Sequence, residues 1–256
     1  MDRKEAVRRQ FASSGDAYVV SPTHASTREL DLLAQWCPSG PELVALDIAT
    51  GGGHTARALA PLVGQMVVSD LTPQMLWQAR RAHLQAGQTG HVYVVADAEN
   101  LPFLDDSFDV VSCRVAPHHF PDVPRFCREV ARVLRPGGTF LLVDSVAPDE
   151  PEAAAVLHHV ELLHDPTHQR SLSRGEWAAV VESAALKVLH REVVVRVHEI
   201  EEWCVRSNTS LEAKAGIYRT LRAAPDQVRV RLQVVEEGDL LRFTDEKLVL
   251  IARKPG

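Results

Sequence analysis

Three carboxylate residues stand where apolar, strand-like segments of this 256-residue chain end: Asp47, Asp70 and Asp97. A run of three glycines at residues 51–53 follows the first of these segments and leads into a helix-like segment. Glycine lets the backbone approach a ligand closely, and the free N–H groups at the start of the next helix point toward that ligand. A carboxylate can accept hydrogen bonds from both hydroxyls of a ribose, and it attracts a cationic sulfonium. The spacing therefore predicts a site for an adenosine-containing ligand.

The glycine turn by itself leaves the ligand open. Residues 51–56 read Gly-Gly-Gly-His-Thr-Ala, which also satisfies the G-x-G-x-x-A fingerprint of dinucleotide-binding turns. A phosphate-bearing dinucleotide would gain nothing from Asp47 so close to its pyrophosphate. The acids favour a ligand without phosphates.

Two histidines are candidates for proton transfer. His118 and His119 follow the fourth apolar segment, and an imidazole titrates near neutral pH. Either could therefore serve as the general base for a hydroxyl or an activated carbon acid. The interpretation we favour is that the pair shapes the pocket wall and orders its loop.

A second group of histidines, His158, His159, His164 and His168, raises the possibility of a metal site. Pro166 interrupts its i, i+4 pair, and no cysteine or clear carboxylate set accompanies it. We therefore expect no metal.

Strand-like and helix-like segments alternate along the chain. Strands are expected at residues 44–48, 65–70, 92–96, 108–113, 139–143, 186–197 and 247–252. Helices are expected at residues 2–14, 54–63, 122–134, 148–168, 173–184 and 199–224. Two more are expected behind capping residues: one follows a capping box at 26–29, and one begins at Thr72, whose hydroxyl would be the cap. This alternation predicts parallel strands joined by right-handed crossovers, so the three strand-end acids share one rim of the sheet.

Composition sets the class of protein. Hydrophobic residues make up 45% of the chain and charged residues 24%, which suits one α/β domain with a large core. The net charge of −6 argues against broad nucleic-acid binding. No apolar run approaches the roughly 18 residues of a membrane span, and four scattered cysteines without a C-x-x-C pair suggest reduced thiols. We expect a cytoplasmic protein.

Five motifs in order carry a family resemblance; they lie at residues 46–53, 70–76, 97–103, 107–111 and 132–138. Together they resemble the class I S-adenosylmethionine (SAM)-dependent methyltransferases, especially the small-molecule group with the methyltransferase type 11 domain that includes the ubiquinone and menaquinone C-methyltransferases. The resemblance implies a Rossmann-like, seven-stranded, mostly parallel α/β sheet with an antiparallel last strand, helices on both faces and an N-terminal helical lid. It implies one domain, residues 1–256, with the lid at 1–40, the SAM-binding core at 41–146, and a substrate-side insertion and sheet completion at 147–256.

The resemblance also implies which residues bind SAM. The methionine end would meet Asp47, Ala49, Gly51, Gly53 and Arg114, the ribose would meet Asp70, and the adenine would meet Leu71, Met75, Asp97 and Ala98. Ala49 departs from the commoner family pattern, which has glycine there. The segment with Phe11, Tyr18 and His24 resembles the aromatic lead segment that folds over SAM, although an ordinary surface helix is an alternative.

The expected function is SAM-dependent methyl transfer to carbon or oxygen of a small apolar or aromatic molecule, with S-adenosylhomocysteine as the product. The segment after the fourth strand lacks the Asn/Asp-Pro-Pro-Tyr signature of amino-group methyltransferases acting on adenine or glutamine. Two alternatives stay open: an NAD-dependent oxidoreductase, and a SAM-binding protein without catalysis. The expected partner is the methyl acceptor, and a monomer and a homodimer are both compatible with the sequence.

Overall fold

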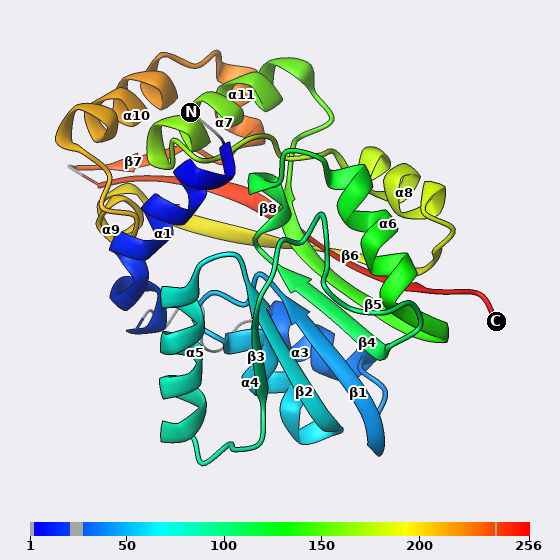
Figure 1. Ribbon diagram of the computed structural model, residues 1–256. Coiled ribbons are helices and arrows are strands. Elements are labelled where there is room, and N and C mark those ends of the chain that lie inside the picture. The colour runs from blue at the N-terminus through cyan, green and yellow to red at the C-terminus, as the bar shows by residue number, and fades with distance from the viewer. Residues whose placement is uncertain (1–2, 21–27, 239) are drawn as a thin grey trace.

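A single twisted sheet with helices on both faces forms the centre of the molecule (Figure 1). The computed structural model describes residues 3–20, 28–238 and 240–256, with only the backbone described at 13–20 and 206. The side chain of Tyr18, all of His24 and the capping residues Ser26 and Thr27 therefore lie outside the described residues.

Seven strands form one continuous path in the order β3-β2-β1-β4-β5-β8-β6, and the short β7 pairs with β8. Neighbouring strands from β3 to β5 are parallel, whereas β8 is antiparallel to both β5 and β6. The expected mostly parallel sheet with an antiparallel last strand is confirmed. The strands are β1 Gly40–Ile48, β2 Val63–Asp70, β3 Val92–Val95, β4 Phe108–Arg114, β5 Leu134–Val146, β6 Lys187–Glu199, β7 Val235–Glu237 and β8 Leu240–Arg253.

The helices cover the sheet in two layers and a cap. They are α1 Arg3–Val20, α3 Arg28–Trp36, α4 His54–Leu59, α5 Pro73–Gln85, α6 Val123–Val133, α7 Pro151–His164, α8 Arg174–Ser183, α9 Ile200–Arg206, α10 Leu211–Ala223 and α11 Asp226–Arg231, with short 3-10 turns η1 Ala60–Leu62 and η2 Pro117–His119.

Alternation along the strands divides the core between the two faces. In β8, Leu248 and Leu250 pack into the cluster with α6 and α8, whereas Val249 and Ile251 pack into the cluster with α3, α4 and α5. Successive side chains of a strand point to opposite faces, so each apolar strand serves both clusters. Trp177 of α8 is 1% exposed within the first cluster, so it belongs to the core.

A third apolar cluster lies above the carboxyl ends of the strands. It joins α7, α9, α10 and α11 to the start of β8, with Leu157, Ile217 and Phe243 among its buried members. Figure 1 shows these helices gathered over one end of the sheet, beside α1. This cap faces the edge where the strand-end acids stand.

Two local expectations differ from the structure. Thr72 is the N-cap of α5 and Pro73 is its first residue, but the Thr72 hydroxyl does not cap the helix. This hydroxyl donates to the Asp70 carboxylate, and the Met75 N–H, which a side-chain cap would bind, donates to the Thr72 carbonyl. The fifth strand is also longer than expected, because β5 begins at Leu134 directly after α6.

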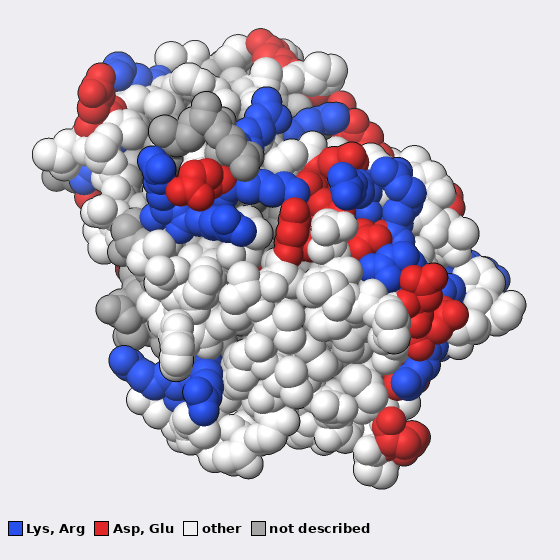
Figure 2. Space-filling view, viewed as in Figure 1, with Lys and Arg blue, Asp and Glu red and all other residues white. Residues whose placement is uncertain are grey.

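The surface mixes charges of both signs. Figure 2 shows basic and acidic side chains interleaved over the upper half of one face, whereas the area around β3 carries few charges. Val92 and Val95 of β3 are exposed there, at the edge of the sheet. Among the described helices, none combines the length and apolar character needed to cross a membrane.

Candidate functional site

A cavity of about 260 Å³ opens at the carboxyl ends of β1, β2 and β4. Its lining residues come from the loops after these strands, from α1, and from the cap formed by α7, α9 and the ends of β6 and β8. Strands that run parallel bring their ends together, so the strand-end segments that resemble the SAM-binding motifs converge on this cavity.

The glycine turn adopts a conformation that few other residues tolerate. Gly51 and Gly53 have φ angles of 52° and 78°, and Ala49 takes φ 51° in the same turn. A Cβ atom on Gly51 would meet nothing within 4 Å, whereas one on Gly53 would lie 2.7 Å from Nε2 of His83. Gly51 therefore presents bare backbone to the cavity, and Gly53 is held against α5 by the fold.

Asp47 lies beneath this turn and does not line the cavity. Its carboxylate accepts hydrogen bonds from the hydroxyls of Thr50, at 2.6 Å, and Ser112, at 2.7 Å. Burial raises its pKa to about 6, although these hydroxyls and nearby Arg114 oppose the change. The carboxylate thus supports the turn from below and places negative charge behind it.

Asp70 lines the cavity wall between two loops. Its Oδ2 accepts a hydrogen bond from the Gly51 N–H at 2.9 Å, and its Oδ1 accepts one from the Thr72 N–H at 2.8 Å. Burial raises its pKa, and these donors act against that rise. The Thr72 hydroxyl and, more weakly, the Leu71 N–H also donate to this carboxylate. Because a carboxylate has about four acceptor positions, at most one is left for a ligand hydroxyl.

The third strand-end acid is paired with the N-terminal helix. Lys4 of α1 donates to Asp97 Oδ2 at 2.6 Å and lies 2.5 Å from Glu99 Oε2. Asp97, Ala98 and Glu99 all line the cavity, and so do Leu71 and Met75 from the loop and helix after β2. These residues form the end of the cavity to which the resemblance assigns the adenine.

Arg114 closes the opposite side of this half of the cavity. Its Nε donates to the Thr55 hydroxyl at 3.1 Å, and the side chain is buried. Burial lowers its pKa to about 10, while the carboxylates of Glu29 and Asp47 favour the charged form. A second pair lies beside it, in which the half-buried Arg196 contacts the buried Glu29 at 2.7 Å.

His118 stands beyond Arg114, against a buried acid. Its Nδ1 is joined by a hydrogen bond of 2.6 Å to Oδ1 of Asp144 on β5. Burial, with Lys247 and His168 nearby, lowers the pKa of His118 to about 3, and burial raises that of Asp144 to about 7. The imidazole is therefore neutral at physiological pH, and Asp144 fixes its orientation.

His119 is held by three groups around its ring. Thr167 Oγ1 lies 3.3 Å from its Nδ1, Asp165 Oδ2 lies 4.0 Å from its Nε2, and the ring of Phe11 packs edge-on at 5.3 Å. Burial lowers the pKa of His119 to about 3. Phe11 belongs to α1, so this helix also reaches the acceptor side of the cavity.

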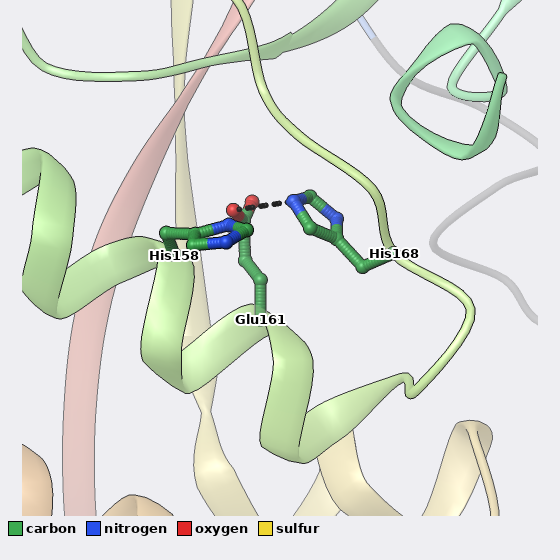
Figure 3. Close-up of side chains that lie close together, drawn as sticks. All are labelled: His158, Glu161 and His168. Atoms are coloured by element: carbon green, nitrogen blue, oxygen red, sulfur yellow. Dashed lines mark ion pairs between the residues drawn. The ribbon is translucent and has the colours of Figure 1, made fainter. Parts of the chain in front are cut away.

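The histidine-rich segment divides into separate environments. His158 and Glu161 project from one face of α7 toward His168 of the following loop, as Figure 3 shows, and Glu161 Oε2 lies 3.2 Å from His168 Nε2. His164 stacks instead on Trp203 with ring centroids 3.7 Å apart. His159 is exposed on the outside of α7.

Further ionisable groups complete the far wall. Lys247 donates to Ser145 at 2.6 Å and to Asp245 at 2.7 Å, and His198 Nε2 lies 3.0 Å from Asp245. Burial raises the pKa of Asp245, but the charges of His198 and Lys247 outweigh it and hold that pKa well below its usual range. The acceptor half of the cavity is consequently richer in polar groups than the expected apolar substrate requires.

Comparison with known proteins identifies the family. Residues 46–142 match the family model described as a methyltransferase domain. The chain is 34% identical to the uncharacterized methyltransferase YcgJ of Bacillus subtilis over 86% of this chain and 87% of that protein. The chain belongs to the SAM-dependent methyltransferase family.

Proteins similar to this methyltransferase include solved structures and a curated enzyme. The crystal structure of Bacillus subtilis YcgJ has a TM-score of 0.85, 32% identity and coverage of 89% of this chain and 98% of that one. The ubiquinone/menaquinone C-methyltransferase UbiE of Ectopseudomonas mendocina is 38% identical over 43% of this chain and 45% of its own. A Haemonchus contortus phosphoethanolamine N-methyltransferase bound to S-adenosylhomocysteine shares the fold, with a TM-score of 0.68 at 19% identity over all of this chain and 61% of that one.

The cavity of this methyltransferase gathers most of the residues expected from its sequence. The expected residues that line it are Ala49, Gly51, Asp70, Leu71, Met75, Asp97, Ala98, Arg114, His118 and His119. Asp47 and Gly53 support the turn from behind it. The side chain of Tyr18 lies outside the described residues.

Several lining residues were missed by sequence reasoning. Lys4, Glu161, Asp165, Asp245 and Lys247 come from segments outside the five motifs. One pattern could have indicated part of this set: Asp245 and Lys247 occupy alternate positions before an apolar strand segment, so they point to the same face of the sheet. The pairing of Lys4 depends on tertiary placement and has no local pattern.

Proposed function

We propose that this methyltransferase transfers the methyl group of SAM to carbon or oxygen of a small molecule whose apolar or aromatic skeleton carries an acidic hydroxyl or enol. The observation that carries the proposal is the His118–Asp144 pair in the wall of the acceptor half of the cavity. Only a weakly acidic acceptor needs a base, and the neutral imidazole of His118, oriented by Asp144, is free to accept a proton. Burial makes it a weak base in the free protein, with a pKa of about 3, so the proposal requires the negative charge that develops on the acceptor to raise that pKa during proton transfer.

The residues of the nucleoside half fit SAM. Gly51 leaves open space at the turn, Asp70 offers acceptor capacity for a ribose hydroxyl, and Leu71 with Met75 offers apolar surface for the adenine. Asp47 supplies negative charge behind the turn, next to the proposed position of the methionyl group. SAM supplies an electrophilic methyl group when it is bound.

The residues of the acceptor half would then orient the second reactant. Phe11, Phe120 and Trp203 provide aromatic surface for the skeleton, while His118 and Lys247 lie among the polar groups that can meet its oxygen. His118 would take the proton from the acceptor as the carbon or oxygen attacks the methyl group in line. Holding both reactants and excluding water accounts for much of the acceleration in such displacements.

The division of the chain follows from the same contacts. We propose that residues 1–40 form a lid, residues 41–146 bind SAM, and residues 147–256 complete the acceptor cavity and the sheet. Support comes from Lys4 and Phe11, which reach the two halves of the cavity, and from the separate apolar cluster of α7, α9, α10 and α11. The four buried free thiols fit a reducing compartment, so the expected cytoplasmic location stays part of the proposal.

The test is an acceptor screen with a matched pair of variants. The chain would be incubated with SAM and a panel of phenols, catechols, quinols and enolisable diketones, with amines and thiols as contrasting acceptors, and the products would be identified by mass. His118→Gln should lower kcat by about 100-fold to 10,000-fold for every accepted compound and leave the KM for SAM unchanged. The exposed His159→Gln on α7 should retain full turnover.

Two results would contradict the proposal. One is a His118→Gln variant that turns over as fast as the wild type. The other is wild-type turnover confined to amines or thiols, because those acceptors carry neither the hydroxyl nor the acidic carbon that the proposal requires.

A further inference from the structure

We propose that His158, Glu161 and His168 form a binding site for a divalent transition-metal ion in the wall of the acceptor cavity. Two imidazoles and one carboxylate are a donor set that suits Zn²⁺ and its neighbours in the first transition series. From sequence alone we expected no metal in this segment, because Pro166 interrupts the spacing of its histidines.

The fold brings the three side chains together by two devices. His158 and Glu161 are three residues apart on α7, and side chains at that spacing share one helix face. The chain then turns after His164, where Asp165 accepts hydrogen bonds from the N–H and hydroxyl of Thr167. This turn returns His168 to the same face of α7, and Figure 3 shows all three side chains converging.

The distances suit coordination of one ion. One donor atom from each residue can be chosen so that all three lie within 4.8 Å of one another. Ligand atoms about 2.0–2.2 Å from a tetrahedral Zn²⁺ lie roughly 3.3–3.6 Å apart. The separation of 3.2 Å between Glu161 Oε2 and His168 Nε2 is just below that range, and small side-chain rotations would bring in His158.

The unsatisfied atoms of the cluster point to a missing partner. Within the described part of the chain, His158 Nδ1 is buried and has no hydrogen-bond partner, and the buried His168 Nε2 makes no hydrogen bond beyond its ion-pair contact of 3.2 Å with Glu161. Glu161 is 7% exposed, and besides the ion pair its oxygens receive only two long contacts of 3.3 Å from the Ser171 hydroxyl. Buried polar atoms are normally satisfied, and a cation would satisfy these three residues together.

The position of the cluster would give the ion access to a ligand. Glu161 and His168 line the main cavity, and His158 with Glu161 lines a second cavity beside α7. The three protein ligands would leave at least one coordination position open, as in catalytic rather than structural metal sites. A hydroxyl or carboxylate oxygen of a small molecule could reach that position. Metal binding itself requires neither SAM nor an acceptor.

The test uses Zn²⁺ alone on the full chain. Chelator-treated protein would be dialysed against buffered Zn²⁺, bound metal would be counted by mass spectrometry, and Co²⁺ would report the ligand environment through its visible absorption. Wild type and the adjacent control His159→Gln should each hold one equivalent. His158→Gln, Glu161→Gln and His168→Gln should lose it or bind it about 100-fold more weakly.

Folding and function are read separately in the same experiment. Melting in metal-free buffer checks that each variant is folded, and S-adenosylhomocysteine titration checks the cofactor half independently of the metal. Zn²⁺ should raise the melting temperature of wild type and of His159→Gln but not that of Glu161→Gln. Wild type that holds no Zn²⁺, or folded Glu161→Gln and His158→Gln that hold as much as wild type, would overturn the proposal.

Discussion

At the scale of single residues, Asp70 makes the most direct prediction about the cofactor. It already accepts two backbone hydrogen bonds and one from the Thr72 hydroxyl at the cavity wall, and its remaining acceptor position suits a single ribose hydroxyl. Asp70→Asn should therefore weaken S-adenosylhomocysteine binding by about 10-fold to 100-fold, the worth of one hydrogen bond to a charged group. Isothermal titration measures the change.

The control for Asp70 is Asp31→Asn, which changes an exposed acid on α3. Its affinity should equal that of wild type. Equal affinities for Asp70→Asn and Asp31→Asn would show that the ligand is held elsewhere.

Ala49 carries a stability prediction. Its φ of 51° lies in the left-handed region, where a Cβ atom costs roughly 1 kcal/mol relative to glycine. Ala49→Gly should raise the free energy of unfolding by up to about 1 kcal/mol, as measured by urea denaturation, without weakening S-adenosylhomocysteine binding. Ala56→Gly, in the buried α4, should lower it by about 1 kcal/mol or more. A lower stability for Ala49→Gly would mean that the methyl group packs favourably.

The buried Asp47 carboxyl should make the affinity for SAM depend on pH. Burial raises its pKa to about 6, so in the free protein the carboxyl is mostly neutral below that pH and charged above it. A cationic ligand attracts only the charged form, so SAM affinity should fall as the pH is lowered from 7.5 to 5.

The variant Asp47→Asn isolates this group. At pH 7.5 it should bind SAM about 10-fold more weakly, because it lacks the charge, and its affinity should change less between pH 7.5 and 5. It should melt no lower than wild type without ligand, since an ionised carboxylate is unfavourable in a buried position. Parallel pH profiles for wild type and variant would exclude Asp47 as the titrating group.

At the scale of elements, α1 has contacts that a lid requires. Lys4 reaches Asp97 and Glu99 at the proposed adenine end, and Phe11 packs on His119 at the acceptor end. Deleting residues 1–25 should weaken SAM binding while the sheet stays folded, as judged by circular dichroism and titration. Lys4→Gln in the full chain should give a smaller loss. A truncated protein with unchanged affinity would rule out the lid.

The elements also show where sequence patterns were sufficient. Strand-end acids, the glycine turn and the period of α6 are local features, and they predicted β1, β2, β4 and α6 near their observed positions. The helix expected from residue 173 begins as α8 behind a capping box, in which Ser173 and Glu176 make both reciprocal hydrogen bonds. The Thr72 cap was wrong, because the Met75 N–H donates to the Thr72 carbonyl while the Thr72 hydroxyl donates to Asp70.

The missed features depend on contacts between distant elements. Pro166 indicated an interruption, yet the turn that contains it brings His168 back to Glu161. Glu29 looked like a member of a capping box, and its carboxylate is found in a pair with Arg196 of β6, across 167 positions of sequence. No local periodicity encodes such pairs.

At the scale of the whole molecule, the antiparallel β8 connects the parts. It lies between β5 and β6, it supplies side chains to all three apolar clusters, and its Asp245 and Lys247 reach the cavity. The final strand of the sequence therefore completes both the sheet and the acceptor wall. This arrangement also separates the fold from that of dinucleotide dehydrogenases, which the glycine fingerprint alone could not do.

The most direct test of the account is a calorimetric titration of the purified full chain with S-adenosylhomocysteine, with NADH in a parallel cell. The cavity described above should bind one S-adenosylhomocysteine per chain and give no heat with NADH. Binding of NADH alone, or of neither compound, would contradict the assignment of the strand-end acids and of the cavity they line.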